Sequence, residues 1–251
     1  MKPSISIIIP ALNEKGNLEP TVETVVRSIE KKFNDYELLI FNDGSTDETG
    51  DIADQLAREN NHIRVIHHTH NNGLGFSYRE GVELATKEYI GWVPGKNSIP
   101  EETLDNMFGA VGIADIVAVY ILTETRSKFR QVVSRIFTKM MNTLFGMNLR
   151  YFNGPCIHKS KLVKNVKMST NGFAFMAETL VRLIKSGHSY VEVGLHNRDR
   201  TIGNSKAFVY KNFIRVGEVV IRLFWEVQIV GAFKGEYKYR PQVVQIDQQL
   251  S

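Results

Sequence analysis

The sequence predicts an α/β protein whose mostly parallel sheet carries helices on both faces. Short β-branched runs alternate with segments of helical spacing through the first half of the chain, and polar residues follow where each run ends. With 251 residues, of which 43% are hydrophobic, the chain can bury one substantial core. Parallel strands joined by helices bring their carboxyl ends to one edge of the sheet, and the loops there form the ligand crevice.

The first four strands and the helices between them follow from this alternation. Ile5 to Ile9 is a β-branched run that Pro10 ends, and apolar residues at helical spacing follow from Leu18 to Phe33. The segment Asp43 to Asp47 makes a turn and caps the next helix. Strands are therefore expected at 5–9, 36–41, 63–66 and 89–93, and a third helix at about 75–86.

The second half predicts a further strand and two amphipathic helices. The strand is expected at 116–120, and the helices at about 127–147 and 208–230. Both helices join a broad apolar face to basic residues, so each either packs on the core with a solvated basic side or lies at a membrane interface. The chain then divides into a main domain of residues 1–206, an amphipathic helical extension at 207–234 and an irregular tail at 235–251.

Composition narrows the partners. The 31 basic and 27 acidic residues give a net charge of +4, which suits a phosphate-bearing small molecule or an anionic lipid but is too mild to indicate nucleic acid. Cys156 is the single cysteine, so an internal disulfide and a cysteine cluster for zinc are excluded. No signal peptide and no transmembrane helix are expected, which predicts a cytoplasmic protein that attaches, at most, peripherally to the membrane. The sequence is compatible with a homo-oligomer but does not set the oligomeric state.

Four short motifs occur in order at the predicted loops. They are Pro-Ala-Leu-Asn-Glu at 10–14, Asn-Asp-Gly-Ser-Thr-Asp at 42–47, Asn-Asn-Gly-Leu-Gly at 71–75 and Arg-Thr-Ile-Gly-Asn-Ser-Lys at 200–206. Together they resemble the family 2 glycosyltransferases of the Rossmann-like GT-A fold, especially the branch like dolichol-phosphate mannose synthase. That branch loads a sugar onto a polyprenyl phosphate. The resemblance covers residues 4 to 206.

The resemblance implies a nucleotide-sugar site at the strand ends. The residues it places there are Pro10, Asn13, Glu14, Asn42, Asp43, Gly73, Gly75 and Asn97. Carboxylates at such a site accept hydrogen bonds from base NH and ribose OH groups. Asn42 stands where the family often has an aspartate, which weakens any charge-based role. Two alternatives remain open: Asp43 only caps a turn, and Gly73 and Gly75 only form the loop that begins a helix.

The resemblance also implies an acceptor and phosphate side. Arg200, Ser205 and Lys206 correspond to a loop that closes over the donor diphosphate or the acceptor phosphate, the alternative being a solvated basic loop. Three arginines fall where polyprenyl-phosphate members bind the acceptor: Arg126, Arg130 and Arg135. Glu178 either helps to position the acceptor or faces a helix surface.

Lys96 departs from the family pattern. Members carry Asp-x-Asp after the fourth strand to hold Mg²⁺ or Mn²⁺ against the diphosphate, and Pro94 and Lys96 occupy those places here. Neither side chain is a metal ligand, and Asn97 offers at most one oxygen. At an effective dielectric of about 20, an ammonium about 4 Å from a divalent ion is repelled by roughly 8 kcal/mol. Lys96 therefore either replaces the cation, or marks a protein that binds without turnover, or is an inactivating substitution. The nearby cluster His67, His68 and His70 is expected to be solvated or hydrogen-bonded rather than metal-binding.

These observations predict a glycosyltransferase that moves a sugar from a nucleotide-diphosphate sugar to a (poly)prenyl phosphate or similar acceptor. The first alternative is a catalytically silent binding or partner subunit. A nucleotidyltransferase is the second alternative, and it is disfavoured because its phosphate loop is rich in glycine and basic residues. The segment Pro10 to Gly16 has one glycine and one lysine.

Overall fold

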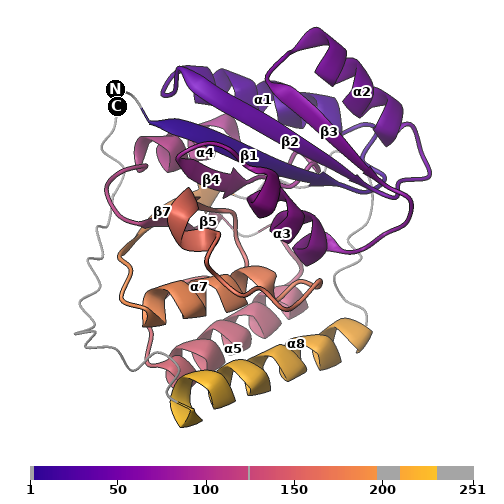
Figure 1. Ribbon diagram of the computed structural model, residues 1–251. Helices are drawn as coiled ribbons and strands as arrows, with labels where there is room; N and C mark the ends of the chain where they lie inside the picture. Colours follow the sequence, from indigo (N-terminus) through magenta and orange to yellow (C-terminus); the bar gives the residue numbers. More distant parts are fainter. Residues whose placement is uncertain (1–2, 124, 197–209, 231–251) are drawn as a thin grey trace.

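The computed structural model describes residues 3–123, 125–196 and 210–230 of the chain (Figure 1). Its centre is a seven-stranded sheet with the strand order β3-β2-β1-β4-β6-β5-β7. The strands are β1 (Ser4–Ala11), β2 (Asp35–Asp43), β3 (Ile63–His68), β4 (Tyr89–Trp92), β5 (Ile116–Thr123), β6 (Cys156–Lys159) and β7 (Tyr190–His196). The helices are α1 (Leu18–Glu30), α2 (Thr49–Glu59), α3 (Leu74–Leu84), α4 (Glu101–Gly109), α5 (Lys128–Phe145), α6 (Ser160–Val163), α7 (Phe175–Lys185) and α8 (Tyr210–Phe224). A π-helical turn, Trp225–Ile229, continues α8.

The mostly parallel sheet predicted from the sequence is confirmed. Strand β1 pairs in parallel with β2 and β4, and β2 pairs in parallel with β3. The register places Ala11 opposite Asn42, and Asn42 opposite His67. The polar residues that end these strands therefore lie along one edge of the sheet, as the alternating pattern predicted.

Strands β6 and β7 complete the sheet in a way that the sequence pattern did not predict. Strand β6 runs antiparallel between β4 and β5, and β7 adds in parallel to β5. The expected strand at 116–120 is confirmed and extends to Thr123. Because β6 has four residues and gains its partners from distant parts of the chain, local spacing carries little sign of it.

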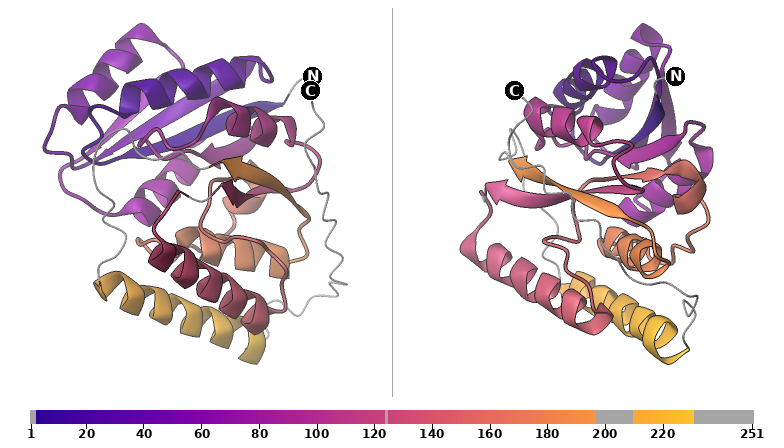
Figure 2. Two further views of the ribbon diagram at one scale, coloured as in Figure 1. Left: turned by 180° about the vertical axis from the view of Figure 1, so that it is seen from behind. Right: turned by 90° about the vertical axis from the view of Figure 1, so that its left-hand side faces the viewer.

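Side chains of the sheet are buried on both faces, in two separate cores. Ile5, Ile7 and Ile9 of β1 pack with α1, α2 and α4, whereas Ile8 faces the core that contains α3, α5, α7 and α8. Alternate residues of a strand point to opposite faces, so both faces need helices to cover them. Figure 2 shows α5, α7 and α8 gathered on the same side of the sheet, with α5 and α8 farthest from it.

The two outer helices keep large apolar side chains in contact with solvent. On α5 these are Phe129, Val132 and Ile136, and Ile221 and Trp225 extend from α8 and its π-helical turn. In the described part of the chain, no helix combines the length and the apolar character that crossing a membrane requires.

Candidate functional site

The loops after β1 and β2 are hydrogen-bonded into one unit. The backbone N–H of Asn13 donates to Ser45 Oγ (3.0 Å), and Asn13 Oδ1 accepts from the N–H of Thr46 (2.8 Å). The N–H of Glu14 donates to Thr49 Oγ1 (2.8 Å). Asn13 has a φ of 55°, a left-handed conformation that asparagine tolerates better than most residues. The first two predicted motifs therefore meet in space.

Asp43 fixes the next loop of this edge. Its buried carboxylate accepts hydrogen bonds from the backbone N–H groups of Asn72 and Gly73, each at 2.9 Å. It also contacts His68, whose Nδ1 lies 2.7 Å from Asp43 Oδ1. Asp43 therefore does cap backbone N–H groups, as the alternative predicted, but these belong to the loop after β3. Contact with a base or ribose stays a prediction.

His68 lies between two carboxylates. Its Nδ1 faces Asp43, and its Nε2 lies 2.8 Å from Glu80 Oε2. Burial lowers the pKa of His68, but the hydrogen bonds to the two carboxylates outweigh it, so the pKa is raised above its ordinary value. A carboxylate oxygen within hydrogen-bond distance of each ring nitrogen favours the doubly protonated imidazole, which agrees with the raised pKa.

The remaining strand-end residues also have protein partners. Asn42 Oδ1 accepts from the N–H of Ser45 (3.1 Å), and its Nδ2 lies 3.0 Å from His67 Nδ1. Glu14 accepts a hydrogen bond from Asn17 Nδ2 (2.7 Å). The carbonyl of Pro10 accepts from the N–H of Gly95 (3.0 Å), which ties the end of β1 to the loop after β4.

Gly73 and Gly75 allow two loops to touch through their backbones. Gly73 has a φ of 97°, and a Cβ there would lie 2.5 Å from the carbonyl oxygen of Asn171. The N–H of Gly75 donates to that same oxygen at 2.9 Å. Helix α3 begins directly after Gly73, as the helix-start alternative predicted. The close approach seen here is to the segment 169–172, and approach to a ligand stays a prediction.

The loop after β4 does not fit the metal site of the family. Pro94 has no side-chain donor, Lys96 is a half-buried cation, and Asn97 could supply one oxygen. Two predicted acids of the neighbouring strand-end loops, Glu14 and Asp43, already accept protein hydrogen bonds. Across the described residues, no group of three or more His, Cys, Asp or Glu could hold a metal ion. Within the described ranges, the loop after β4 and its neighbours therefore do not form a magnesium or manganese site.

Glu178 is fully buried in α7. Its Oε1 accepts from Ser169 Oγ (2.5 Å), and its Oε2 accepts from the N–H groups of Ser169 (3.1 Å) and Thr170 (3.3 Å). Arg182 Nη2 lies 3.1 Å away. The alternative that Glu178 faces a helix surface is wrong, because none of its surface is exposed. Any effect of Glu178 on an acceptor passes through the segment 169–172 that it holds.

The three candidate acceptor arginines do not form one cluster. Arg126 donates to the hydroxyl of Tyr151 (3.4 Å) and lies over its ring, before α5 begins. Arg130 is half-buried in the first turns of α5, and Arg135 is exposed five residues later. Five residues turn an α-helix by about 140°, so Arg130 and Arg135 point to different sides. Arg200, Ser205 and Lys206 lie outside the described residues.

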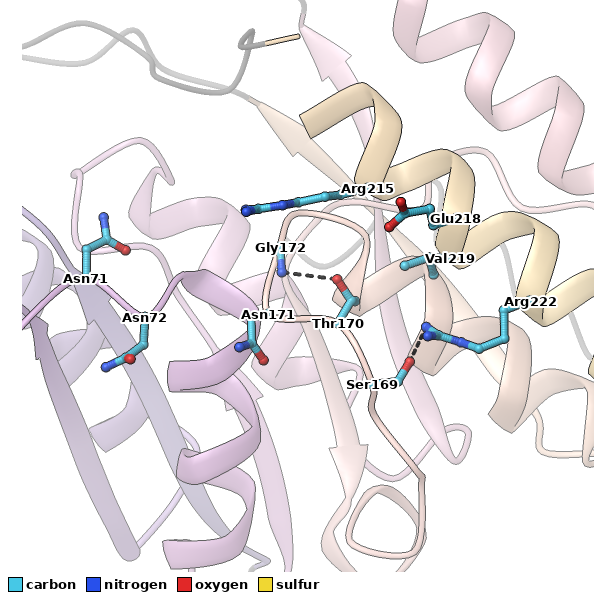
Figure 3. Close-up of a pocket in the computed structure, with 10 residues that line it drawn as sticks. All are labelled: Asn71, Asn72, Ser169, Thr170, Asn171, Gly172, Arg215, Glu218, Val219 and Arg222. Carbon is cyan, nitrogen blue, oxygen red and sulfur yellow. Dashed lines mark hydrogen bonds between the residues drawn. The ribbon is translucent and has the colours of Figure 1, made fainter. Parts of the chain in front are cut away.

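A polar hollow of about 420 Å³ lies between the strand-end loops and α8 (Figure 3). Its lining residues are Asn71, Asn72, Ser169, Thr170, Asn171, Gly172, Arg215, Glu218, Val219 and Arg222. Arg222 donates to Ser169 Oγ and lies 3.8 Å from Glu178 Oε1. The sequence motifs did not predict this site. The spacing of residues 215, 218, 219 and 222 could have shown it, because it places three charged side chains on one helix face.

The mostly parallel sheet with helices on both faces is a GT-A-like fold. Solved structures with a similar fold include glucosyl-3-phosphoglycerate synthase from Mycobacterium tuberculosis in complex with Mn²⁺, uridine diphosphate and phosphoglyceric acid. The match has a TM-score of 0.69 at 15% identity and covers 88% of this chain and 78% of that one. The family model described as "Glycosyl transferase family 2" matches residues 6–163 of the chain. The chain therefore belongs to glycosyl transferase family 2. The resemblance to family 2 glycosyltransferases that the four motifs predicted is confirmed.

Relatives within the family differ in length. Polyprenol monophosphomannose synthase from Mycolicibacterium smegmatis is 26% identical over 214 residues, which cover 80% of this chain and 79% of that protein. The uncharacterised glycosyltransferase EpsJ from Bacillus subtilis is 32% identical over 120 residues, or 45% of this chain. The aligned region spans only 34% of EpsJ and 36% of glycosyltransferase GlyG from Streptococcus pneumoniae. The chain thus matches about a third of the length of those two relatives.

Proposed function

We propose that this glycosyltransferase transfers a sugar from a nucleoside diphosphate sugar to a lipid phosphate, such as a polyprenyl phosphate, at a membrane surface. The observation that carries the proposal is the pair α5 and α8, which exposes apolar and basic side chains together on the same side of the sheet. A relative that aligns over 80% of the chain is named as a polyprenol-phosphate enzyme, which supports this acceptor class.

The exposed side chains suit an interfacial location. Phe129 and Ile136 of α5 are 66% and 63% exposed, and Ile221 of α8 is 72% exposed. Basic residues accompany them on α5, where Lys128 and Arg135 are exposed. Helices that combine such faces bind the boundary between lipid headgroups and acyl chains, where the apolar side chains leave water and the cations meet anionic lipid. This arrangement would bring a lipid acceptor to the enzyme without a membrane-spanning helix in the described residues.

The proposed chemistry needs charge more than a base. A phosphate oxygen of the acceptor attacks the anomeric carbon of the sugar, the bond from that carbon to the diphosphate breaks, and the nucleoside diphosphate leaves. Because the acceptor phosphate is already anionic, no group has to remove a proton from it. Lys96, at the carboxyl edge of β4, would stabilise the leaving diphosphate in place of the cation that its loop cannot hold.

The other predicted site residues keep their assignments as part of this proposal. The donor nucleotide would lie over the loops of Pro10, Asn13, Glu14, Asn42, Asp43, Gly73, Gly75 and Asn97. Arg200, Ser205 and Lys206 would contact a phosphate, and Arg126, Arg130 and Arg135 would attract the acceptor. Glu178 would act as a positioning residue through segment 169–172.

A second candidate is a protein that binds the donor without turnover, and Lys96 is the observation that favours it. The two proposals separate in a transfer assay with labelled UDP and GDP sugars, polyprenyl phosphate and anionic vesicles. Labelled sugar in the lipid phase supports the proposed function. Binding of a sugar nucleotide without transfer to polyprenyl phosphate, with or without Mn²⁺, would support the silent protein and contradict the proposed function.

A further inference from the structure

The stripe of α8 that faces the polar hollow is charged. Arg215, Glu218, Val219 and Arg222 recur at the spacing of one helix face, and all four line the hollow. An inward stripe of a covering helix is normally apolar, as it is at Val220 and Leu223 of the same helix. Figure 3 shows Arg215 extending across the hollow toward Asn71, on the loop after β3. The polar stripe therefore faces a space that suits a polar ligand.

The charges around the hollow balance. Arg182 pairs with Glu178 (3.1 Å) and Glu226 (2.8 Å), and the lining residue Arg222 lies 3.8 Å from Glu178. The positive charges of these two arginines are therefore matched by two carboxylates. Of the lining residues this leaves Arg215 and Glu218, one of each sign. Both are exposed, and neither forms an ion pair with any residue that the structure describes. The lining thus offers strong donors and strong acceptors with no net charge.

Amide groups complete this set. Asn71 offers an amide donor and acceptor, Asn171 lines the hollow while its Oδ1 accepts from Arg79 Nη2 (3.1 Å), and Val219 is the one apolar side chain among the lining residues. A sugar hydroxyl both donates and accepts hydrogen bonds, which matches a lining of amides, guanidinium and carboxylate. A phosphate dianion would instead meet the Glu218 carboxylate, and an apolar ligand would leave these polar groups unpaired. The volume of about 420 Å³ lies within the range of small-molecule sites.

The walls of the hollow are held in place by buried carboxylates. Asp43 fixes the N–H groups of Asn72 and Gly73, and Glu178 fixes those of Ser169 and Thr170. The two walls meet where the N–H of Gly75 donates to Asn171. The backbone of both loops is therefore fixed before a ligand arrives, which reduces the entropy that binding must overcome.

From these contacts we propose that the hollow between α8 and the loops 71–72 and 169–172 is a carbohydrate subsite, in which Arg215, Glu218 and Asn71 bind sugar hydroxyls. The proposal rests on the proposed function and extends it. The hydroxyls come either from the donor sugar or from a saccharide carried by the acceptor.

The test compares Arg215→Gln and Glu218→Gln with wild type by isothermal titration and by saturation-transfer NMR. The probes are UDP, UDP-glucose, GDP, GDP-mannose and the methyl glycosides of glucose and mannose. Loss of one charged hydrogen-bond partner should weaken sugar binding about tenfold. Matched controls are Arg58→Gln and Glu83→Gln, which change exposed residues of α2 and α3 away from the hollow.

The probes separate the two sources of hydroxyls. Weaker binding of a nucleotide sugar, with unchanged binding of its free nucleoside diphosphate, assigns the hollow to the donor sugar. Weaker binding of a methyl glycoside alone assigns it to a saccharide acceptor. Affinities that match wild type in both variants, competition by inorganic phosphate at the hollow, or a wild-type protein that binds no sugar probe overturn the proposal. If free nucleoside diphosphates also fail to bind, the proposed function fails, and the methyl glycosides still decide this inference.

Discussion

The strand-end loops and the α5–α8 pair differ in which side chains they bury: the loops bury polar side chains, and the helix pair exposes apolar ones. At the strand ends, the side chains of Asp43 and His68 are 6% and 7% exposed and are hydrogen-bonded to one another. On α5 and α8, large apolar side chains such as Phe129 and Ile221 are exposed to solvent. Buried polar groups need partners and exposed apolar patches need cover, so each region has its own physical requirement. The first is satisfied within the chain, and the second calls for a surface outside it.

The difference separates what is rigid from what associates. Hydrogen bonds connect Asp43 to the loop after β3, that loop to Asn171, and the segment 169–172 to Glu178. Helix α8 joins this network through Arg222, and its π-helical turn joins through Glu226, while Ile221 of α8 is exposed to solvent. Helix α8 is therefore the element that belongs to both regions.

The largest expected effect comes from breaking the buried network at its centre. Glu178→Ala removes the acceptor of two backbone N–H groups and one partner of Arg182, which is 8% exposed. Loss of one member of a buried pair costs about 3–5 kcal/mol in the free energy of unfolding. Urea unfolding should show this loss, with Glu83→Ala on the surface of α3 changing stability by less than about 0.5 kcal/mol. A cost below about 1 kcal/mol for Glu178→Ala would show that the network does not hold the segment 169–172.

The next effect is a dependence of stability on pH. Burial lowers the pKa of His158 from 6.5 to about 3. Below pH 6.5 the imidazole of His158 therefore binds a proton in the unfolded chain but not in the folded protein. The free energy of unfolding consequently falls as the pH drops below 6.5. Between pH 7 and pH 5 this costs about 2 kcal/mol.

Urea unfolding at several pH values tests this assignment. His158→Gln should flatten the fall in stability between pH 7 and pH 5, and the exposed His70→Gln should leave it unchanged. His68 works in the opposite sense, because its pKa is raised. Its contribution is complete below pH 6.5 and is lost as pH rises through its folded pKa, so His68→Gln should change the slope above pH 6.5. Equal slopes in wild type and His158→Gln would contradict the role of His158.

A smaller effect is expected at the α5–α8 surface. The double variant Phe129→Ser and Ile136→Ser should reduce co-sedimentation with anionic vesicles at least about tenfold, because two large apolar side chains no longer leave water. Its unfolding free energy should stay within about 0.5 kcal/mol of wild type, since both side chains are exposed. Phe173→Ser, at an exposed position outside these helices, is the matched control. Unchanged sedimentation of the double variant would show that this surface does not meet lipid.

The sequence predicted the fold where elements are long and periodic. Strands β1 to β5 and helices α1, α3 and α5 were expected close to their observed positions. Strand β7 and helix α7 were not singled out as elements. The spacing of Glu178, Arg182 and Lys185 marks α7 as amphipathic and could have shown this helix. The sequence does not show that Glu178 and Arg182 are buried, because their partners lie on other segments.

The candidate site could be predicted from the sequence only in part. Strand topology placed Asn13, Asn42 and Asp43 at one edge because the carboxyl ends of parallel strands coincide. The partners of Asp43 and Glu178 depend on loop conformations that no local pattern encodes. The hollow beside α8 joins three segments distant in sequence, and only the folded chain brings Asn71, Asn171 and Arg215 together.

Binding of a nucleoside diphosphate with and without a metal tests the central claim most directly. Titration of UDP and GDP into the protein, in EDTA and then in Mn²⁺, measures whether Lys96 supplies the positive charge at the donor site. We expect a Kd that EDTA changes less than about twofold, a loss of about tenfold in Lys96→Gln, and Mn²⁺-dependent binding in Lys96→Asp. Binding by the unaltered protein that appears only with Mn²⁺, or an undiminished affinity in Lys96→Gln, would contradict the account.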